Sequence, residues 1–429
     1  MQAGILSSNY SPGAPTPSNL HFGTNTTAQI EESWDGQVNS GMMESKRRPY
    51  PAFFSYLGYT IFSIFLAAAI LEIGSAVVRH AYHWIHPGLA PAPASPAYQG
   101  YPWAEEFWKE EYLRRGSAYE DRYVPFLIWG EKPLHSEYIN VDDSFMGNLR
   151  RTANPLSPAC NQAPRKVIWM FGGSTIFGFG VPDAETVPSH LSRELNSSGP
   201  ACFVILNAGV EGYVTNQELL LEALKTGQRP DMVIFYDGAN EGEAATSPEI
   251  QVPHLEFERV KARIEGTLPS KLDFVQNSNS LGLARAIGGR FKRNRSSAAP
   301  PAELAARAAA ALDNYEANTR VVRSLGQAYN FKVFCFWQPS LAFDGKPLAP
   351  FEQQLQRHIL DSKSFKILKA VNEEAARRSL RGGDFVFLGQ VFDSVKEPLY
   401  IDQYMHLGPR GNQIVAQAIA KWVDGHAEN

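Results

Sequence analysis

The stretch Lys166-Val-Ile-Trp-Met-Phe-Gly-Gly-Ser-Thr175 decides the fold class, because an unbroken apolar run leads directly into a glycine turn. Apolar runs without alternation are typical of strands that are buried on both faces of a parallel sheet. The residues from about 182 to 195 then follow a helical pattern. A strand, a turn and a helix in this order form the repeating unit of an α/β fold.

The same alternation continues toward the C-terminus. Helices are predicted near 216–225, 302–329, 351–380 and 412–423, and strands at 202–206, 232–236, 332–337 and 385–388. Strands separated by helices imply right-handed crossovers and a parallel sheet covered on both faces. The sequence therefore predicts an α/β fold, a three-layer doubly wound parallel sheet of the flavodoxin-like kind, in which residues 241–300 form an insertion.

The first hundred residues differ from the rest of the chain. Residues 1–50 are mostly polar and lack a hydrophobic period, which predicts a disordered tail. A charge-free run of roughly 20 residues follows, long enough to cross about 30 Å of hydrocarbon, so we predict one transmembrane helix at 51–78. A buried core helix or a cleaved signal segment are the alternatives. A Pro/Ala-rich linker at 79–100 and an N-terminal extension at 101–165 would then precede the main domain at 166–429.

The charges around this apolar run predict its orientation. Lys46, Arg47 and Arg48 lie just before it, whereas only Arg79 follows closely. Basic residues favour the cytoplasmic side of a membrane. We therefore expect a single-pass protein with a cytoplasmic N-terminus and an extracytoplasmic folded domain, in the periplasm or at the cell surface.

The composition excludes several classes of protein. The 429 residues are 44% hydrophobic and 20% charged with a net charge of −4, so no basic surface for nucleic acid is expected. Cys160, Cys202 and Cys335 lack the spacing of a zinc site, and no metal or organic cofactor is predicted. Cys160 and Cys202 could pair, but Cys202 falls in a predicted strand, where a free cysteine packs as a small apolar residue. We expect no essential disulfide.

Four polar segments fall in loops at the carboxyl edge of the predicted sheet, where active sites of such folds lie. They are Gly172–Thr175, Asn207–Gly212, Asp237–Glu241 and Asp402–His406. Each segment alone is typical of a structural turn. Together they supply a hydroxyl nucleophile, amide donors, a histidine and a carboxylate, which are the groups needed for acyl transfer.

In this order, the four segments resemble the conserved blocks of the SGNH (GDSL-like) hydrolases, over about residues 166–424. The stretch from Asn140-Val-Asp142 to Arg150 is similar to one in membrane-anchored bacterial members. The resemblance implies no cofactor and assigns roles by position. The nucleophile would be Ser174, the general base His406, its orienting acid Asp402, and the oxyanion hole would combine the Ser174 and Gly212 N–H groups with the Asn240 side chain.

These roles agree with chemical need, because a serine hydroxyl requires a base to attack an ester and a tetrahedral oxyanion requires fixed donors. The chain also departs from the family pattern. The acid usually lies three residues before the histidine, but position 403 is Gln and Asp402 lies four before, so Asp393 remains an alternative. Two further departures, where many members have Asp, are interpreted as tolerated variants: Gly173 and Glu241.

The predicted function is a membrane-anchored ester hydrolase that forms an acyl-Ser174 intermediate with an O-acylated substrate, such as an acetylated carbohydrate or lipid. The expected partners are a small-molecule or polysaccharide ester and the membrane, without nucleic acid. Two alternatives stay open. One is an O-acyltransferase that modifies cell-surface polysaccharide, and the other is a catalytically inactive binding or assembly module.

Overall fold

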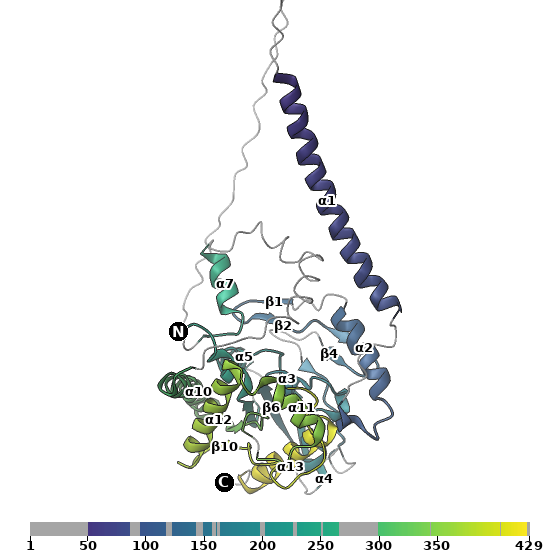
Figure 1. Cartoon of the computed structure of the whole chain (residues 1–429). Coiled ribbons are helices and arrows are strands. Elements are labelled where there is room, and N and C mark those ends of the chain that lie inside the picture. Colours follow the sequence, from purple (N-terminus) through teal and green to yellow (C-terminus); the bar gives the residue numbers. More distant parts are fainter. Residues whose placement is uncertain are drawn as a thin grey trace, which may run out of the picture. The chain divides into compact units, whose positions relative to one another are not determined.

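The computed structural model describes most of the chain (Figure 1). The described residues are 50–85, 95–116, 122–142, 149–156, 160, 164–197, 202–225, 230–249, 252–265, 299–343, 345–403 and 405–426. The predicted tail before residue 50 and most of the predicted insertion therefore lie outside the described residues. The chain divides into two units, Met1–Ile64 and Phe65–Asn429, and the boundary falls inside the first helix.

The first helix, α1 (Tyr50–Ile85), contains the apolar run. Its segment Tyr56–Val77 has 22 residues and a mean hydropathy of 2.0, and only 6% of it is buried. By length and composition this is the one helix among the described residues that could cross a membrane. The helix continues past the predicted end at residue 78, so the first residues of the predicted linker are helical.

The predicted linker also ends earlier than expected. The short 3-10 helix η1 (Pro96–Tyr98) contains the buried side chains of Ala97 and Tyr98. The Ser95 hydroxyl accepts a hydrogen bond from the Ala97 N–H and donates one to the Tyr400 carbonyl at 2.9 Å. Residues 95–100 thus belong to the folded domain.

The main sheet has eight strands in the order β10-β9-β8-β6-β7-β5-β4-β3. Five neighbouring strands are parallel: β10 (Phe385–Phe387), β9 (Lys332–Trp337), β8 (Met232–Asp237), β6 (Arg165–Gly172) and β7 (Cys202–Asn207). Numbered along the chain, these five have the spatial order 2-1-3-4-5 of a doubly wound sheet, as predicted, and the order reverses at β6.

The remaining strands correct the prediction of a wholly parallel sheet. Three short antiparallel strands extend the β7 edge: β5 (Leu149–Arg150), β4 (Asn140–Asp142) and β3 (Leu134–His135). A separate antiparallel pair is formed by β1 (Arg122–Val124) and β2 (Ile128–Gly130). Strands of two or three residues are too short to show alternation, which explains why the sequence did not reveal them.

Helices cover both faces of the sheet, which gives the predicted three layers. On one face lie α4 (Val187–Ser197) and α13 (Pro409–His426), and on the other lie α5 (Thr215–Lys225), α10 (Pro301–Tyr329) and α12 (Lys363–Ser379). Successive residues of a strand pack against the helices on opposite faces of the sheet. Ile168 and Met170 of β6 pack in the first cluster, whereas Trp169 and Phe171 pack in the second.

The other helices lie in connections and near the edges of the sheet. They are α2 (Ala104–Gly116), α3 (Ser174–Phe177), α6 (Ala239–Ala244), α7 (Phe257–Ile264), α11 (Pro350–Ile359) and the 3-10 helix η3 (Asp183–Glu185). The single helix predicted at 351–380 is in fact two helices, α11 and α12. The Ser362 hydroxyl caps α12 by accepting the Phe365 N–H at 3.0 Å, which starts a new helix there.

A disulfide joins Cys160 to Cys202, so Cys202 is not the free strand residue that the sequence suggested. The bond closes a loop across 42 residues, and loop-closure entropy gives about 4 kcal/mol for a bond of this span. The path of the segment before β6 could not be predicted, and neither could its proximity to the start of β7. Cys335 is buried as a free thiol.

Candidate active site

The loops after β6, β7 and β8 meet at the carboxyl edge of the sheet, where the strand order reverses. β6 ends at Gly172 and α3 begins at Ser174, so the candidate nucleophile lies in the first turn after the central strand. In doubly wound sheets, ligands bind in the crevice at this reversal. The sheet topology therefore brings the first three predicted polar segments to one edge.

Ser174, His406 and Asp402 form one hydrogen-bonded chain. The Ser174 Oγ atom lies 2.7 Å from His406 Nε2, and His406 Nδ1 is hydrogen-bonded to Asp402 Oδ2. The Asp402 carboxylate also accepts the His406 backbone N–H at 3.4 Å. Because an ionised carboxylate can only accept, Nδ1 carries the proton and Nε2 presents its lone pair to the serine hydroxyl.

The loop that carries Asp402 and His406 is closed by an antiparallel bridge between Tyr400 and Leu407, both of which are buried. The Ile401 N–H donates to the His406 carbonyl at 3.0 Å, which folds the loop back on itself. Within this loop the Asp402 and His406 side chains face each other. The acid and the histidine therefore form a pair although they are four residues apart, and not three as in the family pattern. The carboxylate on His406 Nδ1 is that of Asp402 and not that of the alternative acid, Asp393, which lies beside Gly345.

A buried ion pair anchors the start of this loop. The Glu352 and Lys346 side chains are completely buried, and Lys346 Nζ lies 2.7 Å from Glu352 Oε2. The other oxygen, Oε1, accepts the N–H groups of Leu399 and Tyr400 at 2.8 and 3.1 Å. The carboxylate thus fixes the backbone just before Asp402, a role that no sequence pattern indicated.

Asn240 lies against the backbone that precedes Ser174. Its Nδ2 atom donates to the Tyr213 carbonyl at 2.6 Å, and a Cβ added at Gly173 would be only 2.2 Å from the same nitrogen. A side chain at position 173 would displace the amide. The departure from the family pattern at Gly173 therefore has a steric reason.

Ser174, Asn240 and Tyr213 line a common cavity of about 10 Å³, the size of roughly one water molecule. Gly212 comes one residue before Tyr213 and has a φ of +77°, but it lines a different, wider cavity together with Trp129. The structure thus brings Ser174, Asn240 and the His406–Asp402 pair together, while Gly212 is linked to them through its neighbour.

Glu241 connects two of the three loops. Its Oε1 atom accepts the Thr215 N–H at 3.0 Å and the Thr215 hydroxyl at 2.7 Å, and its Oε2 atom accepts the Gly238 N–H at 2.9 Å. These bonds hold the loop after β7 to the start of α6, which carries Asn240. The sequence presented Glu241 only as a tolerated variant, so this positioning role was missed.

Asp237 lies at the end of β8 and also lines the Ser174 cavity. Burial raises its pKa well above the usual value, and the nearby Glu218 and Glu241 act in the same direction. Burial likewise raises the pKa of Glu218. A protonated Asp237 adds no negative charge to the wall of the cavity, so it would not oppose an oxyanion that formed there.

An aromatic ring covers the histidine. The ring centroids of Phe179 and His406 are 4.3 Å apart. Phe179 lies between Gly178 and Gly180, which have φ values of +94° and +81°, a conformation that favours glycine. This double-glycine turn is the sequence signal that could have identified Phe179 as part of the site.

Arg150 holds that turn in place from β5. Its side chain is 1% exposed, and it donates to the carbonyls of Phe177, Gly178 and Val181 at 2.9, 2.7 and 2.7 Å. Its Nε atom donates to Asp183 Oδ1 at 3.0 Å. One guanidinium thus fixes the backbone on both sides of Phe179, which only the planar fork of arginine can do.

Two further residues contribute to the cavity wall. The Thr175 hydroxyl donates to Gln338 Oε1 at 2.9 Å, so Gln338 lies beside the residue that follows Ser174. Met405 lines the same cavity and is 6% exposed. Among the residues that the structure describes, no group of three His, Cys, Asp or Glu side chains could hold a metal ion.

Comparison with known proteins gives matches only among solved structures, since neither a protein-family model nor a curated protein sequence matches the chain. An acetylxylan esterase from Geobacillus stearothermophilus is similar over 60% of this chain and 93% of its own, with 14% identity and a TM-score of 0.33. A lipase/acylhydrolase from Enterococcus faecalis is similar over 61% and 96%, with 11% identity and a TM-score of 0.31.

A third similar structure is a protein assigned to the lipolytic G-D-S-L family from Desulfitobacterium hafniense DCB-2, with 9% identity and a TM-score of 0.31 over 60% of this chain and 98% of its own. These structural neighbours are thus an esterase, a lipase/acylhydrolase and a lipolytic protein of the G-D-S-L family. Because all three TM-scores lie below 0.5, the function proposed next rests on the residues of this chain alone.

Proposed function

We propose that the protein is a serine ester hydrolase that forms an acyl-Ser174 intermediate. The observation that carries this proposal is the 2.7 Å contact between Ser174 Oγ and His406 Nε2, with Asp402 bound to the opposite nitrogen of the same ring. A hydroxyl, a base and an orienting carboxylate in this sequence are the parts of a nucleophilic acyl-transfer site.

In the first half of the reaction, Ser174 Oγ attacks the ester carbonyl while its proton moves to His406 Nε2. The tetrahedral intermediate then collapses, the bond to the leaving alcohol breaks, and His406 returns the proton to that alcohol. Asp402 stabilises the positive charge that the imidazole carries between these two transfers. An acyl-Ser174 ester remains.

In the second half, a water molecule attacks the acyl-enzyme. His406 accepts the proton of the water, a second tetrahedral intermediate forms, and its collapse releases the carboxylic acid and returns the proton to Ser174 Oγ. No net oxidation occurs, and no group other than water is required.

The negative oxygen of each tetrahedral intermediate needs donors that are already in position. One proton of the Asn240 amide is used by the Tyr213 carbonyl, so its second proton is available to a ligand. We assign this amide, with the N–H groups of Ser174 and Gly212, to the oxyanion hole. Burial raises the pKa of Asp237, which favours its neutral form, and a neutral carboxyl group would not repel the oxyanion.

We propose that the acyl group is small. The cavity at Ser174 measures about 10 Å³, roughly one water molecule, so the space beside the nucleophile does not accommodate a long chain. A separate cavity of about 300 Å³ shares the lining residues Ala239 and Met405 with it, so the two cavities are neighbours. We infer that the substrate is an acetylated molecule, with an acetylated carbohydrate as the leading class.

We also propose that α1 anchors the protein in a membrane as a single span. The apolar segment Tyr56–Val77 is long enough, and its large side chains are exposed. The basic residues at 46–48 favour a cytoplasmic N-terminus, which would leave the folded domain outside the cytoplasm.

Hydrolysis of p-nitrophenyl acetate by the purified protein tests the enzymatic proposal. Wild type should release p-nitrophenol, and Ser174→Ala should lower kcat by a factor of ~10⁴ or more, since the nucleophile is lost. Ser197→Ala, at the exposed end of α4, serves as the matched control and should retain full activity. A folded wild-type protein without turnover would contradict the proposal and support a binding module instead.

A further inference from the structure

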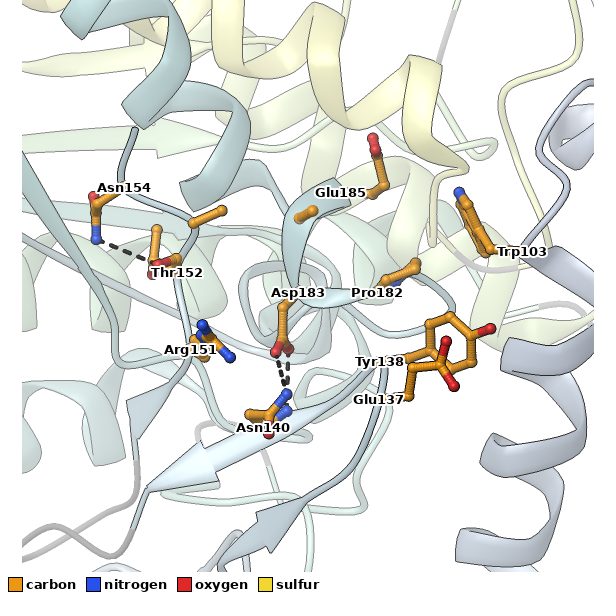
Figure 2. A pocket seen from close by; sticks show the side chains of 12 residues that line it. Trp103, Glu137, Tyr138, Asn140, Arg151, Thr152, Asn154, Pro182, Asp183 and Glu185 are labelled. Atoms are coloured by element: carbon orange, nitrogen blue, oxygen red, sulfur yellow. Dashed lines mark hydrogen bonds between the residues drawn. The ribbon is translucent and has the colours of Figure 1, made fainter. Parts of the chain in front are cut away.

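A second cavity of about 450 Å³ lies on the antiparallel side of the sheet and shares no lining residue with the Ser174 cavity (Figure 2). Its size falls in the range of roughly 300–1,000 Å³ that is typical of small-ligand pockets. Its walls come from β4, the segment after β5, η3, the turn between β3 and β4, and the residue just before α2. The proposed catalytic reaction uses none of these residues.

The polar floor of the cavity is rigid. Asp183 accepts hydrogen bonds from the Asn140 N–H at 3.2 Å, from the Asn140 side chain at 2.9 Å and from Arg150 Nε at 3.0 Å. The Asp183 N–H donates to the Tyr138 carbonyl at 2.9 Å, which ties the turn between β3 and β4 to η3. The cavity is therefore built before any ligand arrives, which lowers the entropic cost of binding.

Two half-buried aromatic side chains form one side of the cavity. Figure 2 shows Trp103 and Tyr138 on one side, Arg151 and Asn154 on the other, with Asp183 between them. Phe107 supports both rings edge to face, with centroids 5.7 Å from Trp103 and 6.0 Å from Tyr138. Such rings offer a flat apolar face and keep a polar tip for hydrogen bonds.

The charges of the cavity are nearly balanced. Asp183 is paired with Arg150, and Glu185 Oε2 lies 4.0 Å from the Arg193 guanidinium and 3.0 Å from His190 Nε2, which is charged only when protonated. The exposed walls then add one carboxylate, Glu137, and one guanidinium, Arg151. A balanced lining favours a neutral ligand over a cation or an anion.

The same walls offer both acceptors and donors. Glu137 can only accept hydrogen bonds and Arg151 can only donate them, while the Asn140 amide can do both. A hydroxyl group both donates and accepts, so several hydroxyls on one ligand would match this mixture. A quaternary ammonium would gain from the aromatic rings but would be repelled by Arg151.

We propose that this cavity is a carbohydrate-binding site, in which sugar rings place an apolar face on Trp103 and Tyr138 and direct hydroxyls to Asn140, Glu137 and Arg151. Asp183 lies nine residues after Ser174, and a chain of that length spans at most about 30 Å, so one polysaccharide could reach both cavities. That this cavity anchors a polysaccharide substrate for Ser174 rests on the proposed esterase function. That the cavity binds a sugar does not.

Isothermal titration calorimetry of the full-length protein in detergent micelles tests the proposal. The probes are three neutral hexasaccharides, cellohexaose, xylohexaose and chitohexaose, with choline chloride and hexagalacturonate as charged comparisons. At least one neutral probe should bind with a sub-millimolar Kd. Trp103→Ala and Tyr138→Ala should each weaken its binding roughly 10-fold, which is typical of the loss of one aromatic platform.

Matched controls separate this site from the catalytic one. Tyr123→Ala removes an aromatic ring that is 75% exposed on β1 and should leave sugar affinity unchanged. Ser174→Ala should abolish ester hydrolysis but bind the hexasaccharide as wild type does, so a failure of the proposed reaction would not affect this result. Tyr138 lies in a surface turn, so its replacement is not expected to disturb folding. Tyr138→Ala therefore provides the test if Trp103→Ala fails to fold.

Three results would overturn the proposal. The first is the absence of binding for all three neutral hexasaccharides up to about 10 mM. The second is binding that neither aromatic variant weakens. The third is a preference for choline or hexagalacturonate over every neutral probe, which would assign the cavity to a charged ligand instead.

Discussion

The two cavities use their polar side chains in opposite ways. At Ser174, the polar groups are bonded to one another, and the space they leave is about 10 Å³. In the cavity of about 450 Å³ beside Trp103, the floor is bonded inward but wall groups such as Glu137 and Arg151 are exposed. The difference indicates that one region is organised to move a proton within the protein, and the other to exchange hydrogen bonds with a ligand.

The largest effect is expected at the bond between Asp402 and His406, on which the first region depends. Asp402→Asn keeps the shape but favours the wrong imidazole tautomer, and kcat for p-nitrophenyl acetate should fall ~10³–10⁴-fold. Asp393→Asn, which changes the alternative acid, is the matched control and should have little effect. Equal losses in both variants would show that Asp402 is not the orienting acid.

The next largest effect is expected at Asn240. Its amide is the side-chain donor of the assigned oxyanion hole, so Asn240→Ala should lower kcat ~10²–10³-fold and change KM little. Asn314, which pairs with Asn216 at 2.7 Å between α10 and α5, offers a control amide remote from the site. A large rise in KM with unchanged kcat would mean that Asn240 binds substrate without stabilising the transition state.

Arg150 links the two regions, because it holds both the Phe179 turn and Asp183. Lysine cannot replace four hydrogen bonds of a planar fork, so Arg150→Lys should lower kcat roughly 10-fold and weaken hexasaccharide binding by a similar factor. Arg165→Lys, at the exposed start of β6, is the control. If only kcat or only the hexasaccharide affinity fell, Arg150 would not support both regions.

The smallest effect on activity is expected at Glu222, which lies outside both cavities beside Trp169 and Phe171. Burial raises its pKa from 4.5 to about 7, and its Oε2 atom has no hydrogen-bond partner among the described residues. The folded state therefore binds a proton more tightly than the unfolded state, and stability is lost as the pH rises from about 4.5 to 7.

Glu222→Gln removes the free-energy cost of ionising a buried carboxyl group. The variant should match wild type near pH 4.5 and exceed it at pH 8 by up to ~3 kcal/mol in the free energy of unfolding, with unchanged kcat. Urea denaturation at the two pH values measures the difference. An equal difference at both values would contradict a titrating buried carboxyl group.

The contrast between the two regions also explains what the sequence could predict. Continuous apolar strands such as β6 and β9 predict the parallel sheet, and the predicted sheet puts Ser174, Asn240 and the Asp402–His406 loop at one edge. Ser174 and Asn240 follow β6 and β8 within three residues, so local pattern fixes their position, whereas Asp402 and His406 lie in a longer loop after β10.

The second region gave no comparable signal. Its walls come from strands of two or three residues and from turns, which lack periodicity, and Trp103 reaches Tyr138 only through tertiary packing. Arg150 and Glu241 were visible as charged residues, but their roles depend on burial and on which carbonyl or N–H groups they meet. The disulfide between Cys160 and Cys202 was hidden for the same reason.

Covalent labelling of the wild-type protein with a fluorophosphonate, followed by mass spectrometry of its peptides, tests the central claim most directly. The reagent reacts with a serine whose proton is taken by a neighbouring base. We predict a single label on Ser174 that is lost in His406→Ala. An unlabelled, folded protein, or a label on a different serine, would contradict the proposed catalytic site.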